Sequence, residues 1–340
     1  MPEAQSHVAA LEALTVPKID RLDFVTVKLP FVAPFGTSVY TWTDKEALLM
    51  RLESDGVTAW SECVSDPDPF YSYETNGTVR HIVQDFLLPL VEPGITLGDL
   101  DARFRRVRGH GMAKATVENG ILVLIALRKG VPLHELMGRP ARKIMSGLSI
   151  GLKETKEELV AAVEKAVARK YGRVKMKVKK GQDVDWVRAV RDRFPDLPLM
   201  VDANGDYTLA DSAHLRADAA AAIALGACRI VNIKQGRVGG LMESMRIAAH
   251  CARHGVGVWS GGMDETGIGR AVNIHLQTAE GFTLPGDTSE TANYFDEDIA
   301  DPPVVLDTNG FIDIPRGPGL GVRIVPERIL KRALRWERLL

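Results

Sequence analysis

Apolar and polar residues alternate along residues 173–179, which predicts a β-strand because successive side chains of a strand point to opposite faces. Lys175 and Lys177 would share one face, and Val174 and Met176 the other. A parallel strand covered on both sides is normally apolar throughout. Two buried ammonium groups are costly without carboxylates nearby. The pattern therefore indicates either a solvated edge strand or a strand whose lysines serve a polar site.

Two later stretches have the same character. Leu199–Asn204 begins as an apolar strand and becomes polar at Asp202, and Arg229–Ile233 is followed directly by Lys234. Both stretches continue into turn residues and then into a helical pattern. Three strands that become polar at their carboxyl ends favour a site at one end of an α/β barrel, where such folds carry their chemistry.

Strand and helix patterns alternate from residue 144 onward, which predicts a parallel sheet with helices on its faces, closed as a barrel. The expected strands are Ile144–Ile150, Arg173–Val178, Leu199–Ala203, Arg229–Ile233, Val256–Ser260 and Phe282–Leu284. The expected helices between them include Lys156–Arg169, Asp183–Arg193 and Leu241–His254.

The preceding part of the chain has strands first and helices after, the order of an α+β domain. Its expected strands are Leu22–Leu29, Lys45–Glu53 and Val57–Cys63, and its expected helices are Glu74–Val91, Leu97–Arg108 and Lys114–Lys129. Ser54–Gly56 predicts a tight hairpin turn. Pro30–Ser38 is rich in proline and aromatic residues, so we interpret it as a mobile loop that covers a site, with an ordinary connector as the alternative.

We therefore expect four segments. Residues 1–18 form a loosely held leader, residues 19–140 an α+β domain, and residues 141–287 a β/α barrel domain. Residues 288–340 return to the first domain through short strand patterns at 310–315 and 319–325.

Composition narrows the functional classes. The net charge of −1 gives no bulk attraction to nucleic acid or to an anionic membrane, and the longest apolar run, Gly120–Leu127, is too short to span a bilayer. The three cysteines are far apart and lack metal-ligand spacing, which disfavours a disulfide framework or a zinc site. We expect a cytoplasmic protein that acts on a small molecule.

Several motifs, taken in chain order, resemble the enolase superfamily, in particular its branch of o-succinylbenzoate synthases and N-acylamino-acid racemases. They are Lys175-Met-Lys177, Val201-Asp-Ala-Asn204, Asn232-Ile-Lys234, Trp259-Ser-Gly-Gly-Met263 and Leu284-Pro-Gly-Asp-Thr288. The resemblance implies an α+β capping domain over a modified β/α barrel. It also implies a homo-oligomer, a role in menaquinone biosynthesis for a synthase, and a small carboxylate as substrate.

The implied chemistry is removal of a proton α to a carboxylate, giving an enediolate stabilised by Mg²⁺, Mn²⁺ or another divalent cation. By resemblance, Lys177 and Lys234 are the acid/base lysines and Lys175 is their companion, expected to lower the pKa of Lys177. Asp202 corresponds to the first metal ligand. The positions that correspond to the substrate pocket and its capping loop are Asn204, Ser149, Gly262, Met263, Phe35 and Thr37.

The chain departs from the family pattern between Asp202 and Lys234. Only six strand patterns occur where a barrel has eight, and this interval is short by about two βα units of roughly 30 residues each. Two carboxylate ligands that the family places on the missing strands are therefore absent. We expect weakened metal binding, with Asp264 and Glu265 as candidate substitutes.

Two classes of function follow from this departure. The chain is either an enzyme of the synthase or racemase type, or a non-catalytic relative that keeps the scaffold and binds carboxylates through its lysines. A shortened form of a complete enzyme is a third explanation of the gap. Closing six strands would require Leu199–Ala203 to pair with Arg229–Ile233; otherwise two sheet edges stay exposed.

Overall fold

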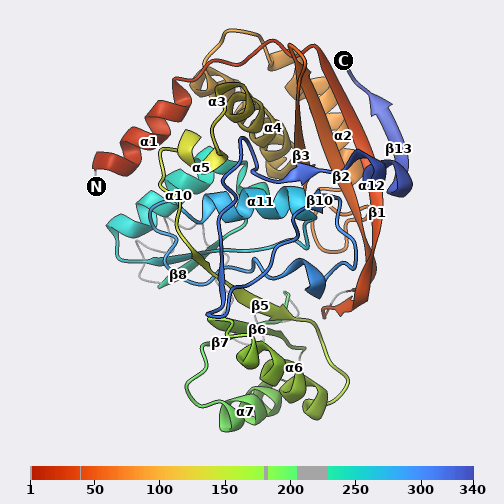
Figure 1. Cartoon of the computed structure of the whole chain (residues 1–340), viewed down its shortest axis with the longest axis vertical. Coiled ribbons are helices and arrows are strands. Elements are labelled where there is room, and N and C mark those ends of the chain that lie inside the picture. The colour runs from red at the N-terminus through yellow and green to blue at the C-terminus, as the bar shows by residue number, and fades with distance from the viewer. Residues whose placement is uncertain (1, 39, 180–182, 205–228) are drawn as a thin grey trace.

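The computed structural model describes residues 2–38, 40–179, 183–204 and 229–340. An antiparallel sheet with helices against it forms one part of the molecule, and parallel strands with their helices form the other (Figure 1). In Figure 1 the first part lies above, and the strands β5–β7 with α6 and α7 form the lower end.

The capping part is built on a four-stranded sheet of order β13-β1-β2-β3. Its strands are β1 (Arg21–Gly36), β2 (Thr41–Ser54), β3 (Val57–Cys63) and β13 (Ala333–Arg338), and its helices are α1 (Pro2–Glu12), α2 (Asn76–Ile82), α3 (Leu97–Phe104) and α4 (Gly111–Lys129). Asp55 and Gly56 both have positive φ in the predicted hairpin turn. A Cβ on Gly120 of α4 would lie 2.5 Å from both Leu52 and Met50, so this glycine permits the close approach of helix and sheet.

Helix α2 ends earlier than the apolar pattern predicts. It continues as a π-turn at Val83–Leu87 and a 3₁₀ turn at Leu88–Leu90. Pro89 lies in this last turn and has no N–H to extend an α-helix. The C-terminus of α4 agrees with the prediction, because Gly130 adopts the left-handed conformation that ends many helices.

The expected mobile loop at Pro30–Ser38 is wrong. Strand β1 continues to Gly36, with Phe35 opposite Trp42 and Gly36 opposite Thr41, after a shift of register between Pro30 and Phe35. Proline and aromatic residues in this stretch suggested a loop, but the partner strand β2 begins at Thr41 and supplies a hydrogen-bonding edge.

The expected loose leader is also wrong for the residues that follow the start of α1. Leu11 and Val16 are 0% and 1% exposed and belong to the main hydrophobic core. The backbone N–H of Val16 donates to the carbonyl of Ile95. Helix α1 packs against α3 and α10, so tertiary contacts order a segment whose own pattern is weak.

The barrel part contains the predicted alternation. Its elements are α5 (Leu133–Leu136), β4 (Ile144–Met145), β5 (Gly147–Ile150), α6 (Lys156–Ala168), β6 (Arg173–Lys177), α7 (Asp183–Arg193), β7 (Leu199–Asp202), β8 (Ile230–Ile233), α9 (Gln235–Val238), α10 (Leu241–Arg253), β9 (Gly257–Ser260) and α11 (Gly267–Leu276). The expected strand at Phe282–Leu284 is present only as an isolated bridge between Val258 and Phe282. The chain there passes through turns, and its backbone pairs with β9 at one residue.

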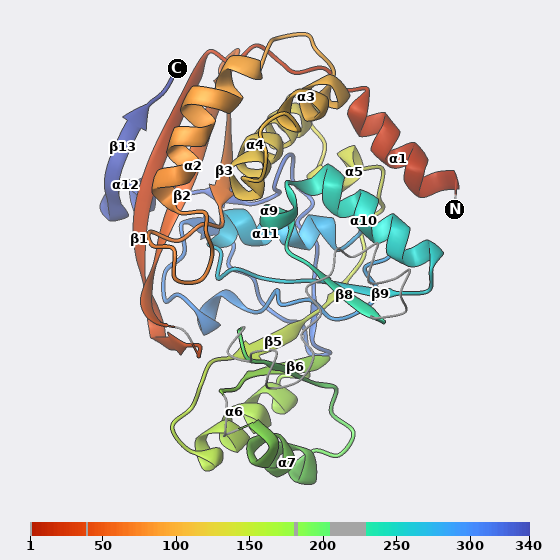
Figure 2. The same cartoon turned by 180° about the vertical axis from the view of Figure 1, so that it is seen from behind.

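The parallel strands form an open arc. Strands β5, β6 and β7 make one sheet and β8 and β9 another, while bridges at Val258–Phe282 and Ser146–Gly286 connect them on one side. In the part of the chain that the structure describes, β7 and β8 are not paired. Val201 on β7 and Ile230 on β8 are 50% and 51% exposed, as expected of open edges. Figure 2 shows β8 and β9 beside α10, apart from β5 and β6.

The C-terminal segment returns to the capping part by a different route from the one predicted. Its elements are a 3₁₀ turn at Thr291–Asn293, β10 (Ala300–Asp301), β11 (Phe311–Ile312), β12 (Arg323–Ile324) and α12 (Pro326–Arg332). Strand β11 pairs with β4 and β12 with β10, so neither joins the first sheet. Strand β13 does so, antiparallel to β1.

Two buried carboxylates of the capping part hold helix N-termini of the barrel part. Glu118 on α4 accepts from the N–H of Met242 on α10. Glu62 on β3 accepts from the N–H groups of Thr266 and Gly269 at the start of α11. The N-terminus of a helix has free N–H groups and a partial positive charge, so these contacts fix one part on the other.

Candidate active site

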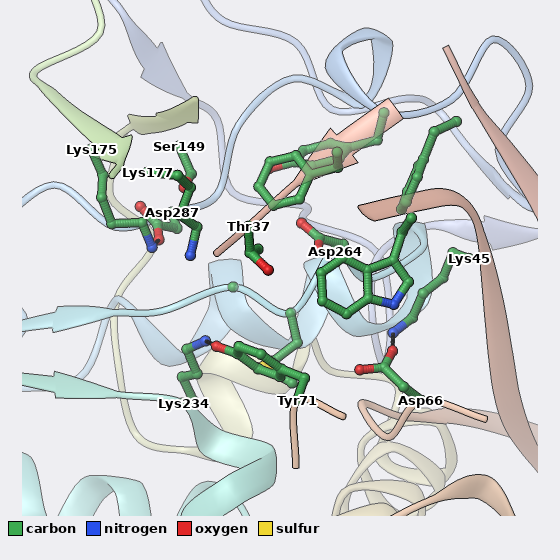
Figure 3. A pocket seen from close by; sticks show the side chains of 16 residues that line it. Thr37, Lys45, Asp66, Tyr71, Ser149, Lys175, Lys177, Lys234, Asp264 and Asp287 are labelled. Carbon is green, nitrogen blue, oxygen red and sulfur yellow. Dashed lines mark hydrogen bonds and ion pairs between the residues drawn. The ribbon is translucent and has the colours of Figure 1, made fainter. Parts of the chain in front are cut away.

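A cavity lies between the capping part and the carboxyl ends of the parallel strands (Figure 3). The lining residues are Phe31, Phe35, Thr37, Trp42, Lys45, Asp66, Tyr71, Ser149, Lys175, Lys177, Lys234, Gly262, Met263, Asp264, Asp287 and Tyr294.

Strand β6 contributes the two lysines that its alternation predicted, Lys175 and Lys177. Lys175 is 4% exposed and donates to Asp287, which also accepts from Arg173. The guanidinium of Arg173 lies over the Trp259 ring, 4.4 Å from its centroid. Burial opposes the charge of Lys175, but Asp287 outweighs this effect and raises the pKa of the lysine above its ordinary value.

Lys177 forms a second ion pair at the same strand end. Its Nζ donates to Asp202 Oδ2 at 2.8 Å, and Lys175 Nζ lies 3.6 Å from the same oxygen. Although Asp202 is largely buried, Lys177 holds the pKa of this carboxyl at about 2. The N–H of Asn204 donates to Asp202 Oδ1 at 3.0 Å and fixes the other oxygen.

Lys234 reaches the cavity from the end of β8, on the other side from Lys175 and Lys177 (Figure 3). Its Nζ donates to Tyr71 Oη at 2.9 Å and lies 3.3 Å from Met263 Sδ. Burial resists ionisation of the Tyr71 phenol, but Lys234 lowers its pKa. Gly261 leaves space for the lysine, because a Cβ there would lie 2.8 Å from Lys234 Cγ.

The capping part supplies the opposite wall. Phe35 and Thr37 lie at the end of β1, and Lys45 on β2 forms a buried ion pair with Asp66 at 3.0 Å. The hydroxyl of Ser38 donates to the carbonyl of Ala203 at 2.6 Å, which joins this wall to the end of β7.

Ten residues were predicted for this site from the sequence, and the structure brings them together between the carboxyl ends of the parallel strands and the capping part. Eight of them line the cavity: Lys175, Lys177, Lys234, Ser149, Gly262, Met263, Phe35 and Thr37. Asp202 accepts from Lys177, and the N–H of Asn204 donates to Asp202. Within the described part of the chain, Ser149 Oγ and Asn204 Oδ1 are buried without a hydrogen-bond partner, a state that suits a polar ligand.

Several residues of the cavity were not predicted. Asp287 follows the last strand pattern, so the same rule of polar strand ends could have identified it. Tyr71, Trp42 and Lys45 belong to the capping part, and no local pattern places them near the lysines. Lys175, the predicted companion charge of Lys177, is itself paired with Asp287.

The donor set does not fit a carboxylate cage for a divalent cation. Across residues 2–38, 40–179, 183–204 and 229–340, no three His, Cys, Asp or Glu side chains come together as metal ligands. Asp202, the predicted ligand, is paired with Lys177. Glu265, a candidate substitute, accepts from Asn273 within α11 and does not line the cavity.

Comparison with known families identifies the fold. Residues 21–138 match the mandelate racemase / muconate lactonizing enzyme N-terminal domain, and residues 158–216 and 209–328 match the enolase C-terminal domain-like family. The chain therefore belongs to the enolase superfamily, with a capping domain and a β/α barrel domain. Enzymes of this superfamily generally use a divalent metal ion such as Mg²⁺.

Similar proteins include two kinds of enzyme. The chain is 40% identical to an o-succinylbenzoate synthase of Geobacillus kaustophilus, covering 92% of this chain and 95% of the relative. It is 36% identical to an N-succinylamino acid racemase of Amycolatopsis, covering 91% and 96%. A solved enolase-superfamily structure from Listeria innocua has a TM-score of 0.88 at 30% identity, covering 95% of this chain and 99% of that one. The non-catalytic alternative finds no support among these relatives.

The alignment of this chain with its relatives contains a gap. The alignment with the Geobacillus synthase has 358 positions but covers 92% of 340 residues, so about 45 positions have no residue here, more than one βα unit of roughly 30 residues. The enolase C-terminal family matches in two overlapping pieces that meet at 209–216. These residues lie outside the described part of the chain, and the loss of two units stays a prediction.

None of the described helices is both long enough and apolar enough to cross a bilayer.

Proposed function

We propose that this protein removes a proton from the carbon next to a carboxylate, as an o-succinylbenzoate synthase, an N-acylamino-acid racemase or both. One observation carries the proposal: Lys177 and Lys234 come from different strands and enter one cavity from two sides (Figure 3). A substrate α-carbon between them would meet an amine on each face, which is the geometry that racemisation needs.

The two lysines have different surroundings. Lys177 is paired with the ionised Asp202. Lys234 is held by the Tyr71 hydroxyl and the Met263 thioether, with no carboxylate in an ion pair among the described residues. In racemisation each lysine would act as the base toward one enantiomer and as the acid toward the other.

Lysine ammonium groups would also stabilise the intermediate. Removal of the α-proton places a second negative charge on the substrate carboxylate, and fixed positive groups in a water-poor cavity stabilise such charge strongly. Lys175 is buried, fixed by Asp287 and adjacent to Lys177, so we assign it this role. Ser149 Oγ has no hydrogen-bond partner among the described residues, so its hydroxyl would donate to a substrate oxygen.

The exchange of α-protons for deuterium tests the proposal. N-acetyl- and N-succinyl-methionine of each hand would be incubated with the protein in D₂O and followed by NMR. Lys177→Ala and Lys234→Ala should each lose racemisation, and each should lose exchange from one face by about 10²- to 10⁴-fold, the usual contribution of a general base. The double variant should lose exchange from both faces.

Lys143→Ala is the matched control, since Lys143 is a half-exposed lysine paired with Asp307 away from the cavity. It should exchange at the rate of the unchanged protein. Exchange of the α-proton that persists in the folded double variant would contradict the proposal.

A further inference from the structure

Asp264 has an unusual place in the cavity. It follows β9 with a φ of 56°, in the left-handed region that few non-glycine residues adopt. Figure 3 shows its carboxylate in the middle of the cavity, between the lysines of the barrel part and the Lys45–Asp66 pair. Within the described chain, no side chain or backbone group forms a hydrogen bond or ion pair with it.

The other charges of the cavity are matched in pairs. Lys45 pairs with Asp66, Lys175 with Asp287, and Lys177 with Asp202. Among the described residues that line the cavity, two charged groups remain outside these pairs: Lys234, which contacts Tyr71 and Met263, and Asp264.

Charged groups of both parts of the molecule surround Asp264. Burial raises the pKa of the Asp264 carboxyl, and Glu265 acts in the same direction, while Lys45, Lys177 and Lys234 oppose them. None of these lysines bonds to Asp264, since each is directed to another partner. A ligand that brought a cation to Asp264 would therefore supply a contact that the protein leaves open.

The walls near this carboxylate also suit a cation. Five aromatic side chains line the same cavity: Phe31, Phe35, Trp42, Tyr71 and Tyr294. Aromatic faces attract ammonium and guanidinium groups, and they strengthen a nearby ion pair by excluding water. A second carboxylate at this place would instead meet like charge.

From this arrangement we infer that Asp264 selects substrates that carry a cationic side chain, namely N-acylated basic amino acids. The inference rests on the proposed function for the position of the reacting carboxylate. That carboxylate lies at the lysine end of the cavity, and the guanidinium or ammonium group of the substrate lies against Asp264.

One substrate pair separates charge from shape. Nα-acetyl-arginine and Nα-acetyl-citrulline differ little except in side-chain charge. The unchanged protein should prefer the arginine compound to the citrulline compound by at least about tenfold in kcat/KM, the ratio that 1.4 kcal/mol gives. Asp264→Asn should reduce this preference below about threefold.

Asn is the apt replacement because it keeps the size of Asp and tolerates positive φ. Asp185→Asn on the exposed face of α7 is the control for net charge and should leave the preference for the arginine compound unchanged. Equal use of arginine and citrulline compounds, or a preference that survives in Asp264→Asn, would overturn the inference.

Calorimetric binding of the same compounds separates this inference from the proposed function. Binding of the arginine compound that is at least about tenfold tighter, and that depends on Asp264, supports the inference even where no exchange occurs and the proposed reaction fails. Exchange without charge preference supports the reaction and overturns the inference. Failure of both compounds to bind overturns it as well.

Discussion

At the scale of single residues, Asp287 is the anion that pairs with two buried cations of β6. Its two oxygens accept from Arg173 and Lys175, and all three side chains are at least nine-tenths buried. Burying charges is costly, and the cost is offset only while each charge keeps its partner. Asp287 thus allows β6 to carry a lysine and an arginine inside the molecule.

Asp287→Asn should destabilise the fold by about 3–5 kcal/mol, because it leaves two buried cations without an anion. Urea unfolding at pH 7 measures this. Asp185→Asn breaks exposed pairs with Lys156 and Arg188, and it should change the free energy of unfolding by less than about 1 kcal/mol. Equal effects of the two substitutions would contradict the assignment of a buried ion-pair centre.

At the scale of elements, a pair of histidines joins three segments. His134 of α5 and His275 of α11 stack with ring centroids 5.2 Å apart. His275 Nε2 lies 3.0 Å from the carbonyl of Leu320, and its Nδ1 lies 3.2 Å from the N–H of His134. A neutral ring with its proton on Nε2 satisfies both contacts, since it donates to the carbonyl and accepts from the N–H.

This arrangement predicts a loss of stability in acid. Burial lowers the pKa of His275 to about 4, below its ordinary value of 6.5. The folded state thus binds the proton less readily than the unfolded chain. The contribution of His275 is fully present above pH 6.5, and it falls by about 3 kcal/mol as the pH decreases to about 4.

Urea unfolding at several pH values between 7 and 4 would measure this loss. His275→Gln keeps a donor toward Leu320 and should flatten the pH dependence relative to the unchanged protein. The exposed His81 pairs with Asp85 on the surface, so His81→Gln should retain the full dependence. An unaltered slope in His275→Gln would show that this ring is not the titrating group.

At the scale of the whole molecule, the arc of strands is open between β7 and β8 within the described chain. The capping part, by contrast, is attached to the barrel part by Glu62 and Glu118 and by the return of β13 to β1. The cavity lies between the carboxyl ends of the strands and the capping part. The scaffold therefore keeps the lysines in place, although no group of metal-binding carboxylates is gathered among the described residues.

Magnesium titration tests this last point. Among the described residues Asp202 is the predicted metal ligand, and its carboxylate is already paired with Lys177. We therefore expect Mg²⁺ to bind with a Kd above about 1 mM. Asp202→Asn should bind equally weakly, and EDTA should leave the thermal unfolding of the protein unchanged. Calorimetric binding in the micromolar range that Asp202→Asn abolishes would show that a metal site has been rebuilt.

Local patterns alone were sufficient for much of this protein. Alternation at residues 173–177 predicted a strand with inward lysines, and repeated strand–helix spacing predicted the parallel elements to within a few residues. These features follow from the periods of strands and helices, which neighbouring residues determine. Polar residues at strand ends likewise indicated Lys177, Asp202 and Lys234, because parallel strands bring their carboxyl ends to one edge of the sheet.

Contacts between distant segments determined the rest. Asp287 balances Lys175 from 112 residues away, and Tyr71 meets Lys234 across 163 residues. Strand β1 continues past Pro30 because β2 supplies an edge, and Val16 is buried because other elements surround it. The sequence thus determined which elements form and which ends are polar. Packing determines which charges are paired, and it leaves Asp264 without a hydrogen bond or ion pair among the described residues. The partner of a buried charge comes from a distant segment, so no pattern of neighbouring residues predicts it.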